Sequence, residues 1–488
     1  MPISKVGSKG IKDAELSAAD IAPGTITSDK IASGTIANAK LANSSITVNG
    51  TAIALGASGD IVAGTDWQSV KTSDFTAVAG EGYFVNTTGG AITLTLPASP
   101  TIGDTIQVRD YAETFGSNNV TLSRNSSNIG GIAANGTLST SKTMTTLVYV
   151  DGTKGWLATE NEAKDNVVPS LYTSATGGTV STSGNYKIHT FNSSSNFVVS
   201  QVGNGSVVPT GGPAVSDYLV VAGGGGGGSG YGAGGGGAGG FRESKSPVAG
   251  TYTASPLASS TGLTITAQTY PITVGAGGGG GPVGKRGVSG SNSIFSTITS
   301  AGGGYGGAYY DPGGSPYSGA GGDGGSGGGE GVSVGGPVAS GNTPPVSPPQ
   351  GQNGGINTNS GNHHASGGGG AGAVGGNGRN DGCNQPTNAN GYGGNGGDGV
   401  STAIKGSSGN YAGGGGGGRE TNCAPHQGSG GSGGGGGAGL NSTAGSNGGA
   451  NQGGGGGGQG GTAAIPSGYG SGGGSGGAGV VIIRYKYQ

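Results

Sequence analysis

Residues 218–228 read YLVVAGGGGGG and residues 479–487 read GVVIIRYKY, so a strand-like apolar run opens and closes the most glycine-rich part of the chain. Residues 1–217 contain 26 of the 125 glycines, which leaves 99 in residues 218–488. Glycine has no side chain with which to build a core, and it loses more backbone entropy on ordering than any other residue. If this block is ordered, contacts between backbones must hold it together.

Polyproline-II geometry offers such contacts, because it has three residues per turn and leaves every N–H and C=O group pointing outward. Glycine segments in this geometry can lie side by side and hydrogen-bond directly to one another, which satisfies the backbone without a conventional core. We therefore predict a polyglycine-II head on a β platform formed by the flanking strands. The predicted rods are Gly223–Gly228, Gly234–Gly237, Gly277–Gly281, Gly368–Gly370, Gly413–Gly418, Gly433–Gly437 and Gly453–Gly458. The alternative is a disordered low-complexity region, which 125 glycines and 21 prolines also indicate.

The less glycine-rich stretches between the rods are predicted to form loops at the tip of the head, at residues 305–317, 337–350, 379–390 and 419–427. Tyrosine is frequent there, and it offers binding loops a large rigid face and a hydroxyl group at low entropic cost. Some of these rings could instead cap the glycine rods. The predicted receptor-binding residues are Tyr305, Tyr309, Tyr310, Asp311, Tyr317, Arg379, Asp381, Tyr392, Tyr411, Arg419, Glu420 and Tyr469.

Both cysteines of the chain, Cys383 and Cys423, lie in predicted tip loops. They are either unpaired thiols or a disulfide that forms after release into an oxidising medium. A metal site that includes His363, His364 and His426 is a further alternative, but the spacing of these residues matches no known ligand pattern. We predict no metal and no cofactor.

A different regularity marks the N-terminal segment, where every fifth residue is a large aliphatic. A period of 5 fits neither a helix nor a strand, and it indicates short extended segments separated by turns. One such chain is too thin to bury its aliphatic stripe, so we predict that three copies wind around a common axis. The alternative is a disordered leader. The aliphatic positions are Val6, Ile11, Leu16, Ile21, Ile26, Ile31, Ile36, Leu41 and Ile46.

Residues 66–160 are predicted to form a small β-sandwich-like module. Residues 91–96 alternate between apolar and polar, as a half-buried strand does, and Pro97 ends the run. Residues 161–217 are predicted to contain a linker and strands of the head platform. Further module strands are predicted at 105–109, 120–122 and 146–150, and the predicted core aromatics are Trp67, Phe75, Tyr83, Phe84, Phe115 and Trp156.

The repeats Gly24–Ser33 and Gly34–Asn43 resemble the shaft segments of bacteriophage tail fibre proteins, and residues 75–156 are similar to a module of marine-phage fibres, including those of cyanophages. The glycine-rich block resembles the receptor-binding head at the distal end of such fibres. The resemblance implies an all-β fibrous homotrimer located in the virion. Residues 1–65 would attach it to the tail or to other virion proteins, and residues 218–488 would bind a host surface polysaccharide or outer-membrane protein.

The composition argues against several other functions. Charged residues make up 9% of the chain and the net charge is −2, so no basic face for nucleic acid is expected. The sequence contains no apolar run of about 18 residues, so no membrane span is predicted. The N-terminus lacks the pattern of a signal peptide, so we expect assembly in the host cytoplasm. Residues 279–285 nearly spell a phosphate-binding loop, but Arg286 stands where a magnesium-binding Ser or Thr is required.

We predict no catalytic residues, because nothing in the sequence pairs two carboxylates as a glycosidase requires. Two other functions remain open at this point. One is a structural virion fibre that binds no receptor, and the other is an enzyme that cleaves host polysaccharide.

Overall fold

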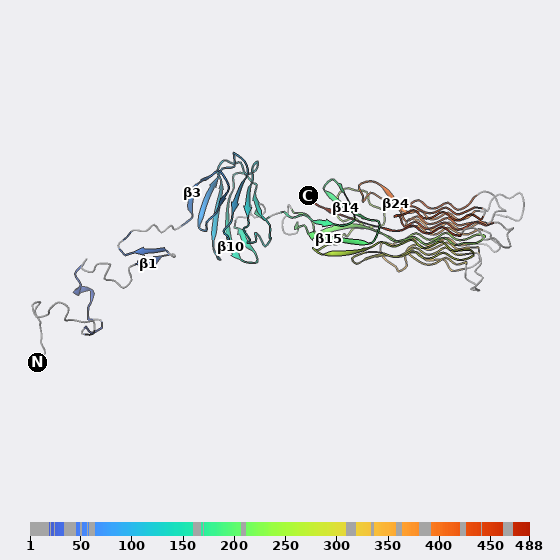
Figure 1. The fold of residues 1–488 in the computed structure, drawn as a ribbon, viewed down its shortest axis with the longest axis horizontal. Helices are drawn as coiled ribbons and strands as arrows, with labels where there is room; N and C mark the ends of the chain where they lie inside the picture. Colours follow the sequence, from blue (N-terminus) through green and yellow to red (C-terminus); the bar gives the residue numbers. More distant parts are fainter. Residues whose placement is uncertain are drawn as a thin grey trace, which may run out of the picture. The chain divides into compact units, whose positions relative to one another are not determined.

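The computed structural model describes residues 19, 21–23, 25–33, 45–48, 51–55, 57, 64–159, 167–168, 170–205, 211–308, 319–332, 336–357, 364–379, 392–419, 426–440, 442–461 and 472–488 (Figure 1). The chain folds into two compact units, Met1–Val167 and Val168–Gln488. Strands make up 31% of the structure, which confirms the prediction of an all-β fold.

The described residues of the N-terminal segment include a 3-10 turn, η2 (Ser28–Lys30), and a hairpin of β1 (Ser45–Val48) and β2 (Thr51–Ala54). Much of the predicted pentad shaft lies outside the described residues, so the winding of three chains stays a prediction. The pentad side chains that are described are all exposed: Ile21, Ile26, Ile31 and Ile46.

In the β module the chain passes back and forth between two sheets. The first sheet contains the parallel strands β3 (Asp66–Lys71), β5 (Glu81–Val85) and β7 (Thr105–Asp110). The second contains the parallel strands β4 (Phe75–Thr76), β6 (Ile92–Thr95) and β8 (Val120–Ser123). Antiparallel β9 (Gly136–Leu138) completes the second sheet, and β10 (Met144–Asp151) and β11 (Gly155–Ala158) complete the first. The two-sheet arrangement agrees with the predicted module, whereas the parallel pairing was not predicted.

Apolar side chains from both sheets share one core in this module. Leu94 and Leu122 of the second sheet and Ile106 and Leu147 of the first are fully buried. Buried and less buried positions alternate along β6 and β7, as expected when one face of a strand packs inward. The module is thus held by a conventional side-chain core.

The predicted core aromatics divide into two groups. Tyr83, Phe115 and Trp156 are buried, and Phe75 packs against the core. Trp67 is instead 40% exposed, because it lies on the edge strand β3. The prediction that Trp67 is a core residue is therefore wrong. The remaining predicted core aromatic, Phe84, is half-buried, and its ring lies against Trp67 with 4.6 Å between ring centroids.

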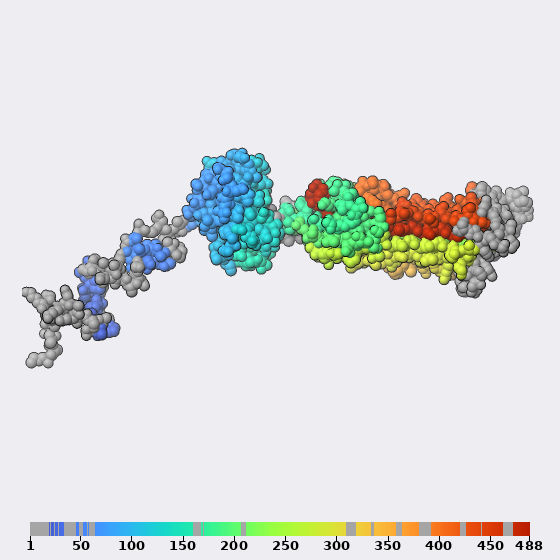
Figure 2. Space-filling model, viewed as in Figure 1, coloured from blue at the N-terminus to red at the C-terminus, as the bar shows by residue number. Residues whose placement is uncertain are grey.

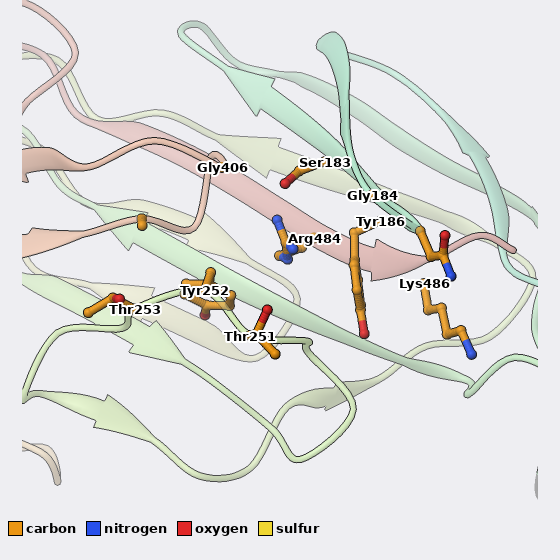
Figure 3. A pocket seen from close by; sticks show the side chains of 11 residues that line it. Ser183, Gly184, Tyr186, Thr251, Tyr252, Thr253, Gly406, Arg484 and Lys486 are labelled. Carbon is orange, nitrogen blue, oxygen red and sulfur yellow. The ribbon is translucent and has the colours of Figure 1, made fainter.

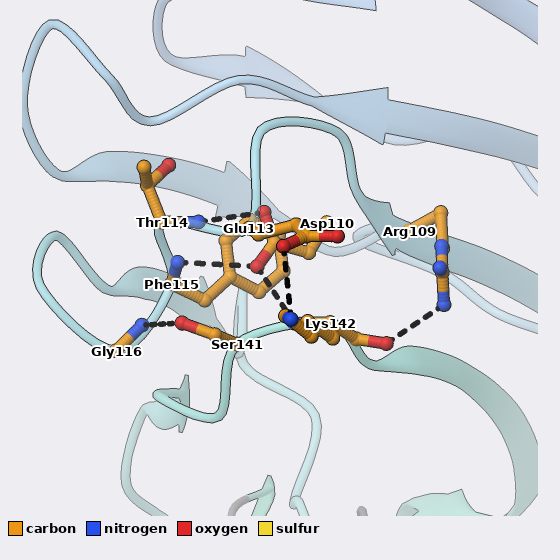
Figure 4. A network of polar contacts seen from close by, with 8 residues as sticks. All are labelled: Arg109, Asp110, Glu113, Thr114, Phe115, Gly116, Ser141 and Lys142. Carbon is orange, nitrogen blue, oxygen red and sulfur yellow. Dashed lines mark hydrogen bonds and ion pairs between the residues drawn. The ribbon is translucent and has the colours of Figure 1, made fainter.

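A buried carboxylate ties two loops of the module together (Figure 4). Asp110 is 3% exposed, and its Oδ2 accepts hydrogen bonds from Phe115 N at 3.2 Å and Lys142 N at 3.1 Å. Arg109 Nη1 donates to Lys142 O at 2.8 Å, and Lys142 Nζ lies 3.2 Å from the Glu113 carboxylate. This exposed ion pair adds little stability, while the buried hydrogen bonds fix the loops.

The second unit begins with the head platform, which consists of two main sheets and a hairpin. One sheet has the order β13 (Thr179–Ser183), β14 (Tyr186–Phe191), β25 (Val480–Lys486), β16 (Val215–Val221), β17 (Phe241–Ser244) and β18 (Ala258–Ser259), with β19 (Leu263–Thr264) paired to β16. The other has the order β12 (Ser174–Thr176), β15 (Ser195–Gln201), β20 (Thr269–Thr273), β21 (Ser293–Phe295) and β22 (Ile298–Ser300). The hairpin consists of β23 (Val400–Thr402) and β24 (Gly409–Tyr411).

The two ends of the glycine-rich block meet in the centre of the first sheet, as predicted. β16 and β25 are antiparallel neighbours, with Leu219 opposite Ile482. Leu219 and Ile482 face one core cluster, whereas Val220 and Val481 face another. Burial on both faces explains why these strands are unbroken apolar runs rather than alternating ones.

The glycine-rich segments form rods that run from the platform and back, and each rod bonds to its neighbours through the backbone. The rod Gly223–Gly228 shows the pattern, because its consecutive residues donate hydrogen bonds to different neighbours. Gly223 and Gly226 donate to Ser291 and Val288, Gly224 and Gly227 to Gly477 and Gly474, and Gly225 and Gly228 to Gly237 and Gly234, all at 2.9–3.0 Å. The period of three residues is that of polyproline II.

The same rod also accepts hydrogen bonds from three further rods. Gly303 and Gly306 donate to Gly223 and Gly226, Gly278 and Gly281 to Gly224 and Gly227, and Gly456 and Gln459 to Gly225 and Gly228, at 2.8–3.0 Å. Each N–H and C=O group of the rod is therefore paired, although the rod has no internal hydrogen bond. This agrees with the predicted polyglycine-II packing, in which the backbone itself forms the core.

Glycine is required in the interior rods because the rods approach one another too closely for a side chain. A Cβ atom on Gly226 would lie 2.1 Å from Gly279 O, and a Cβ atom on Gly236 would lie 2.1 Å from Gly225 O. Positive φ is not the reason, since the described head glycines with positive φ lie at turns or rod ends, such as Gly284 and Gly472. The predicted rod Gly433–Gly437 is shorter than predicted, because Gly433 and Gly434 have positive φ and belong to a turn.

Rods at the surface lack neighbours on one side, and Asn or Asp side chains there bridge to the next rod. Asn395 Oδ1 accepts a hydrogen bond from Ser429 N at 2.9 Å, and Asp398 Oδ1, one turn later, accepts one from Ser432 N at 2.8 Å. Rod 275–281 lies directly against rod 472–479, and Gly476 N donates to Gly278 O at 2.8 Å (Figure 2). The same side-chain bridge to a backbone N–H is made by Asn292, Asp323, Asn353, Asn377 and Asn447.

Successive rods run in opposite directions, so the connections between them alternate between the two ends of the bundle. Gln350 lies at the platform end, where its carbonyl oxygen accepts from Phe241 N and its Oε1 accepts from Ala301 N, both at 2.8 Å. The prediction that residues 337–350 form a tip loop is therefore wrong. The described residues that flank segments 309–318, 358–363, 380–391, 420–425 and 462–471 lie at the opposite end, which we call the distal end (Figure 1).

Candidate functional site at the distal end

The structure places the predicted binding residues in different environments. Tyr305, Arg379, Tyr392, Tyr411 and Arg419 are described. The others lie outside the described residues, together with both cysteines: Tyr309, Tyr310, Asp311, Tyr317, Asp381, Cys383, Glu420, Cys423 and Tyr469.

Three neighbouring rods form a groove at the distal end, with a volume of about 480 Å³. The rods cover residues 373–379, 392–399 and 426–432, and backbone hydrogen bonds join them. Gly376 N donates to Asn395 O at 2.7 Å, and Gly393 N donates to His426 O at 3.2 Å. The groove therefore has a rigid floor made of rod backbone.

Arg379 and Tyr392, both predicted as binding residues, lie together in this groove. Their backbones exchange two hydrogen bonds of 3.2 Å. The Tyr392 ring stacks on His426 with 5.0 Å between centroids and 26° between the ring planes. All three side chains are exposed, and Tyr392 is 38% exposed. The groove thus offers a guanidinium group beside a pair of stacked rings.

The described lining of the groove also contains amide side chains, and it includes no carboxylate. Asn377, Asn395 and Gln427 line it. Asn377 and Asn395 each use Oδ1 to accept a hydrogen bond from a backbone N–H. This bond holds the side chain in place and leaves its NH₂ group as a donor. An arginine, fixed amide donors and an aromatic pair are groups that bind oxygen-rich ligands such as sugars and carboxylates.

A buried polar network positions the rod that carries Arg379. The Glu330 carboxylate is 2% exposed and accepts hydrogen bonds from Gly336 N at 3.0 Å and Asn357 N at 2.8 Å. Ser366 Oγ donates to Asn357 Oδ1 at 3.1 Å and accepts from Gly378 N at 3.2 Å. Burial raises the pKa of Glu330, and the two backbone donors oppose that shift. The residue before Arg379 is therefore held from inside the bundle.

Tyr305 lies on a surface rod and is paired with a cation. Arg286 Nη1 donates to the Tyr305 hydroxyl group at 3.1 Å, and its guanidinium carbon lies 4.8 Å from the ring centroid. Gly322 packs so closely under the ring that a Cβ atom there would lie 2.6 Å from Tyr305 Cδ1. Tyr305 therefore covers a glycine rod, as the alternative interpretation of the tyrosines proposed.

Two predicted binding residues are buried, which corrects their assignment. Tyr411 belongs to β24, is 6% exposed and packs in a platform core, at the end of its rod that is remote from the groove. Arg419 lies at a rod end but is also 6% exposed, and its backbone pairs with His364. The position of a tyrosine or arginine next to a glycine run in the sequence therefore does not predict whether its side chain is buried or exposed.

His426 was not among the predicted binding residues, although it lies in the predicted loop 419–427. Its stacking on Tyr392 depends on two rods that are adjacent in space and separated in sequence, so no local pattern could reveal it. Within the described ranges, no three His, Cys, Asp or Glu side chains gather as a metal site would require. No helix in those ranges has the length and apolar character of a membrane span.

Comparison with known proteins gives one result. No curated protein is significantly similar to the chain. The sequence model of a glycine-rich domain family matches residues 199–486, which include the last part of β15, all the rods and all of β25. The chain belongs to this glycine-rich domain family.

Proposed function

We propose that the protein is a bacteriophage tail fibre that binds a receptor on the surface of a bacterial host through the distal end of its glycine-rich head. The observation that carries this proposal is the polarity of the rod bundle. Its platform end is closed by sheets, whereas its distal end presents the groove of Arg379, Tyr392 and His426. A rigid surface loses little entropy on binding, which favours recognition.

The proposed fibre is a homotrimer that attaches to the virion through residues 1–65. The exposed pentad side chains support this part of the proposal, because Ile26 is 55% exposed and Ile46 is 53% exposed in a single chain. An aliphatic stripe of this kind needs neighbours to be buried. Three heads on one shaft would raise the avidity for a repetitive cell surface.

The proposed mechanism is adhesion without catalysis, and the test is binding to cells. Labelled full-length protein is incubated with a panel of cyanobacteria and other marine bacteria, and the bound fraction is measured by flow cytometry. On a strain that binds the wild type, the double substitution Arg379→Ala and Tyr392→Ala should lower affinity at least about tenfold, as expected for loss of central contact residues. Tyr111→Ala is the matched control, since Tyr111 is 56% exposed in the other unit.

The alternatives give different results in the same experiment. A structural fibre would bind no strain, or would bind equally well with and without the double substitution. An enzyme would release reducing sugar from host polysaccharide. Light scattering should give three times the chain mass of 45.7 kDa, and a monomer would contradict the trimer.

A further inference from the structure

A second pocket lies in the head platform, at the opposite end of the rods from the distal groove (Figure 3). Its volume is about 700 Å³, within the range of sites for small organic ligands. Four separate segments line it: the turn between β13 and β14, residues 251–253, the loop between β23 and β24, and strand β25. Ser183, Tyr186, Thr251, Tyr252, Arg484 and Lys486 are among the lining residues.

Arg484 is the central feature of this pocket. It is 3% exposed, and its guanidinium carbon lies 4.4 Å from the ring centroid of Tyr186 and 5.1 Å from that of Tyr252. Arg484 Nε donates to Ala249 O and Nη1 donates to Ile404 O, both at 3.2 Å. Within the described residues, no partner bonds to Nη2. The guanidinium group is thus held rigidly by two carbonyl oxygens and two rings where it lines the pocket.

The walls that hold Arg484 are themselves fixed. The Tyr186 hydroxyl group donates to Val248 O at 3.1 Å, and the Tyr252 hydroxyl group donates to Ser244 O at 2.8 Å. Gly250 lies against the Tyr186 ring, and a Cβ atom there would be 2.6 Å from Tyr186 Cε2. The pocket therefore needs little rearrangement to accept a ligand, which reduces the cost of binding.

The charge in the pocket is not balanced by its lining. Arg484 and Lys486 both line it, and no Asp or Glu of the described residues does. Asp217, which does not line the pocket, lies opposite Arg484 in the sheet register and interacts with it electrostatically, and its carboxylate also accepts three hydrogen bonds from Ser244 and Ser246, at 2.7–3.0 Å. Burial lowers the pKa of Arg484, which reflects the cost of removing its charge from water, and Tyr252, Tyr186 and Asp217 offset only part of that shift. An anionic ligand would offset that cost.

We propose that this pocket binds an acidic sugar unit of a surface polysaccharide. The carboxylate of the sugar would accept hydrogen bonds from Arg484 Nη2, since guanidinium groups match the geometry of carboxylates. Lys486, on the other side of the Tyr186 ring, would attract the acid through its charge without touching it (Figure 3). The sugar hydroxyl groups would meet the polar rim formed by Ser183 and Thr251. The proposal is independent of the distal groove, and each site can be removed without touching the other.

The test is calorimetric titration of the full-length protein with D-galacturonic acid, D-galactose and inorganic phosphate. We expect D-galacturonic acid to bind at least about tenfold more tightly than D-galactose, because a charge-assisted hydrogen bond changes affinity by at least that factor. Lys486→Gln should weaken its binding about two- to fivefold, as expected for loss of one nearby charge that makes no direct hydrogen bond. Thr251→Trp, at an exposed rim position, should block the pocket without removing a charge.

Lys187→Gln is the matched control, because Lys187 lies on β14 beside Tyr186, does not line the pocket and changes the net charge equally. It should bind D-galacturonic acid as the wild type does, and unchanged melting temperatures should show that all variants are folded. Equal binding of the acid and the neutral sugar, or equal effects of the Lys486 and Lys187 substitutions, would overturn the proposal. Phosphate binding as tight as that of D-galacturonic acid would overturn the assignment to a sugar.

Discussion

The β module and the glycine rods are both densely packed, but they are held together in opposite ways. In the module, side chains such as Leu94 and Ile106 fill the space between two sheets, and the backbone bonds within each sheet. In the rods there are almost no side chains inside, and each interior backbone group bonds to a neighbouring rod. The comparison teaches that a chain unable to form a hydrophobic core can satisfy its backbone directly.

The two regions should therefore respond oppositely to a change in side-chain size. A module core position tolerates no loss of volume, whereas an interior rod position tolerates no gain.

The largest effect is expected for Gly226→Ala, in the interior of the bundle. The added Cβ atom would lie 2.1 Å from Gly279 O, and a backbone oxygen cannot move away as a flexible side chain can. We expect a loss of at least about 3 kcal/mol in the free energy of unfolding of the head, the upper end of the usual cost of overpacking. Thermal unfolding followed by calorimetry measures it.

Gly279→Ala provides the matched control, since no atom lies within 4 Å of a Cβ atom at that position. Its stability should stay within about 0.5 kcal/mol of the wild type, as for an ordinary surface substitution. Equal effects of the two substitutions would show that close approach of the backbones is not what requires glycine.

The reverse change belongs to the module. Leu94→Ala removes a fully buried side chain, and we expect a loss of about 2–5 kcal/mol in the free energy of unfolding of this unit. The unfolding transition of the head should not move. Val78→Ala, at a side chain that is 55% exposed, should leave both transitions unchanged. A loss of head stability caused by Leu94→Ala would show that the two units do not unfold independently.

A smaller effect is expected at the surface of the bundle. Asn395→Ala leaves Ser429 N without its acceptor and should cost about 0.5–1.5 kcal/mol, the usual contribution of one hydrogen bond. Asn395→Asp keeps an acceptor oxygen in the same place, as Asp398 shows one turn later, and should be much less harmful. If both substitutions cost the same, the side-chain acceptor does not stabilise the surface rods.

The smallest effect is expected from pH. His189 is fully buried, its Nδ1 lies 2.7 Å from Gly177 O, and burial lowers its pKa from 6.5. Between the lowered pKa and 6.5, the unfolded chain binds a proton that the folded chain does not. The head should therefore lose stability as pH falls below 6.5. In His189→Gln the melting temperature should fall less between pH 7 and pH 5.5, and an unchanged slope would assign the effect to other groups.

The sequence was sufficient to predict the features that depend on composition and on apolar runs. The rods, the pairing of β16 with β25 and the side-chain core of the module follow from such patterns. Positions that depend on the path of the chain were not predictable. Residues 337–350 lie at the platform end because of the number of rods that precede them, and no local signal encodes that number.

The candidate sites show the same division. Arg379 and Tyr392 were predicted as binding residues from the composition of their loop, and they lie together in one groove. Tyr411 was predicted by the same logic, yet its ring points into a core. The platform pocket had one sequence signal, the single arginine in the apolar run of β25, but its four walls come from distant segments.

Amide hydrogen exchange of the rods is the most direct test of whether backbone-to-backbone bonding holds the head together. The amides of Gly223–Gly228 should exchange as slowly as those of β16 and β25, because each is bonded to a neighbouring rod inside the bundle. Exchange of these glycine amides at the rate of an unstructured peptide, while β16 and β25 stay protected, would contradict the backbone core.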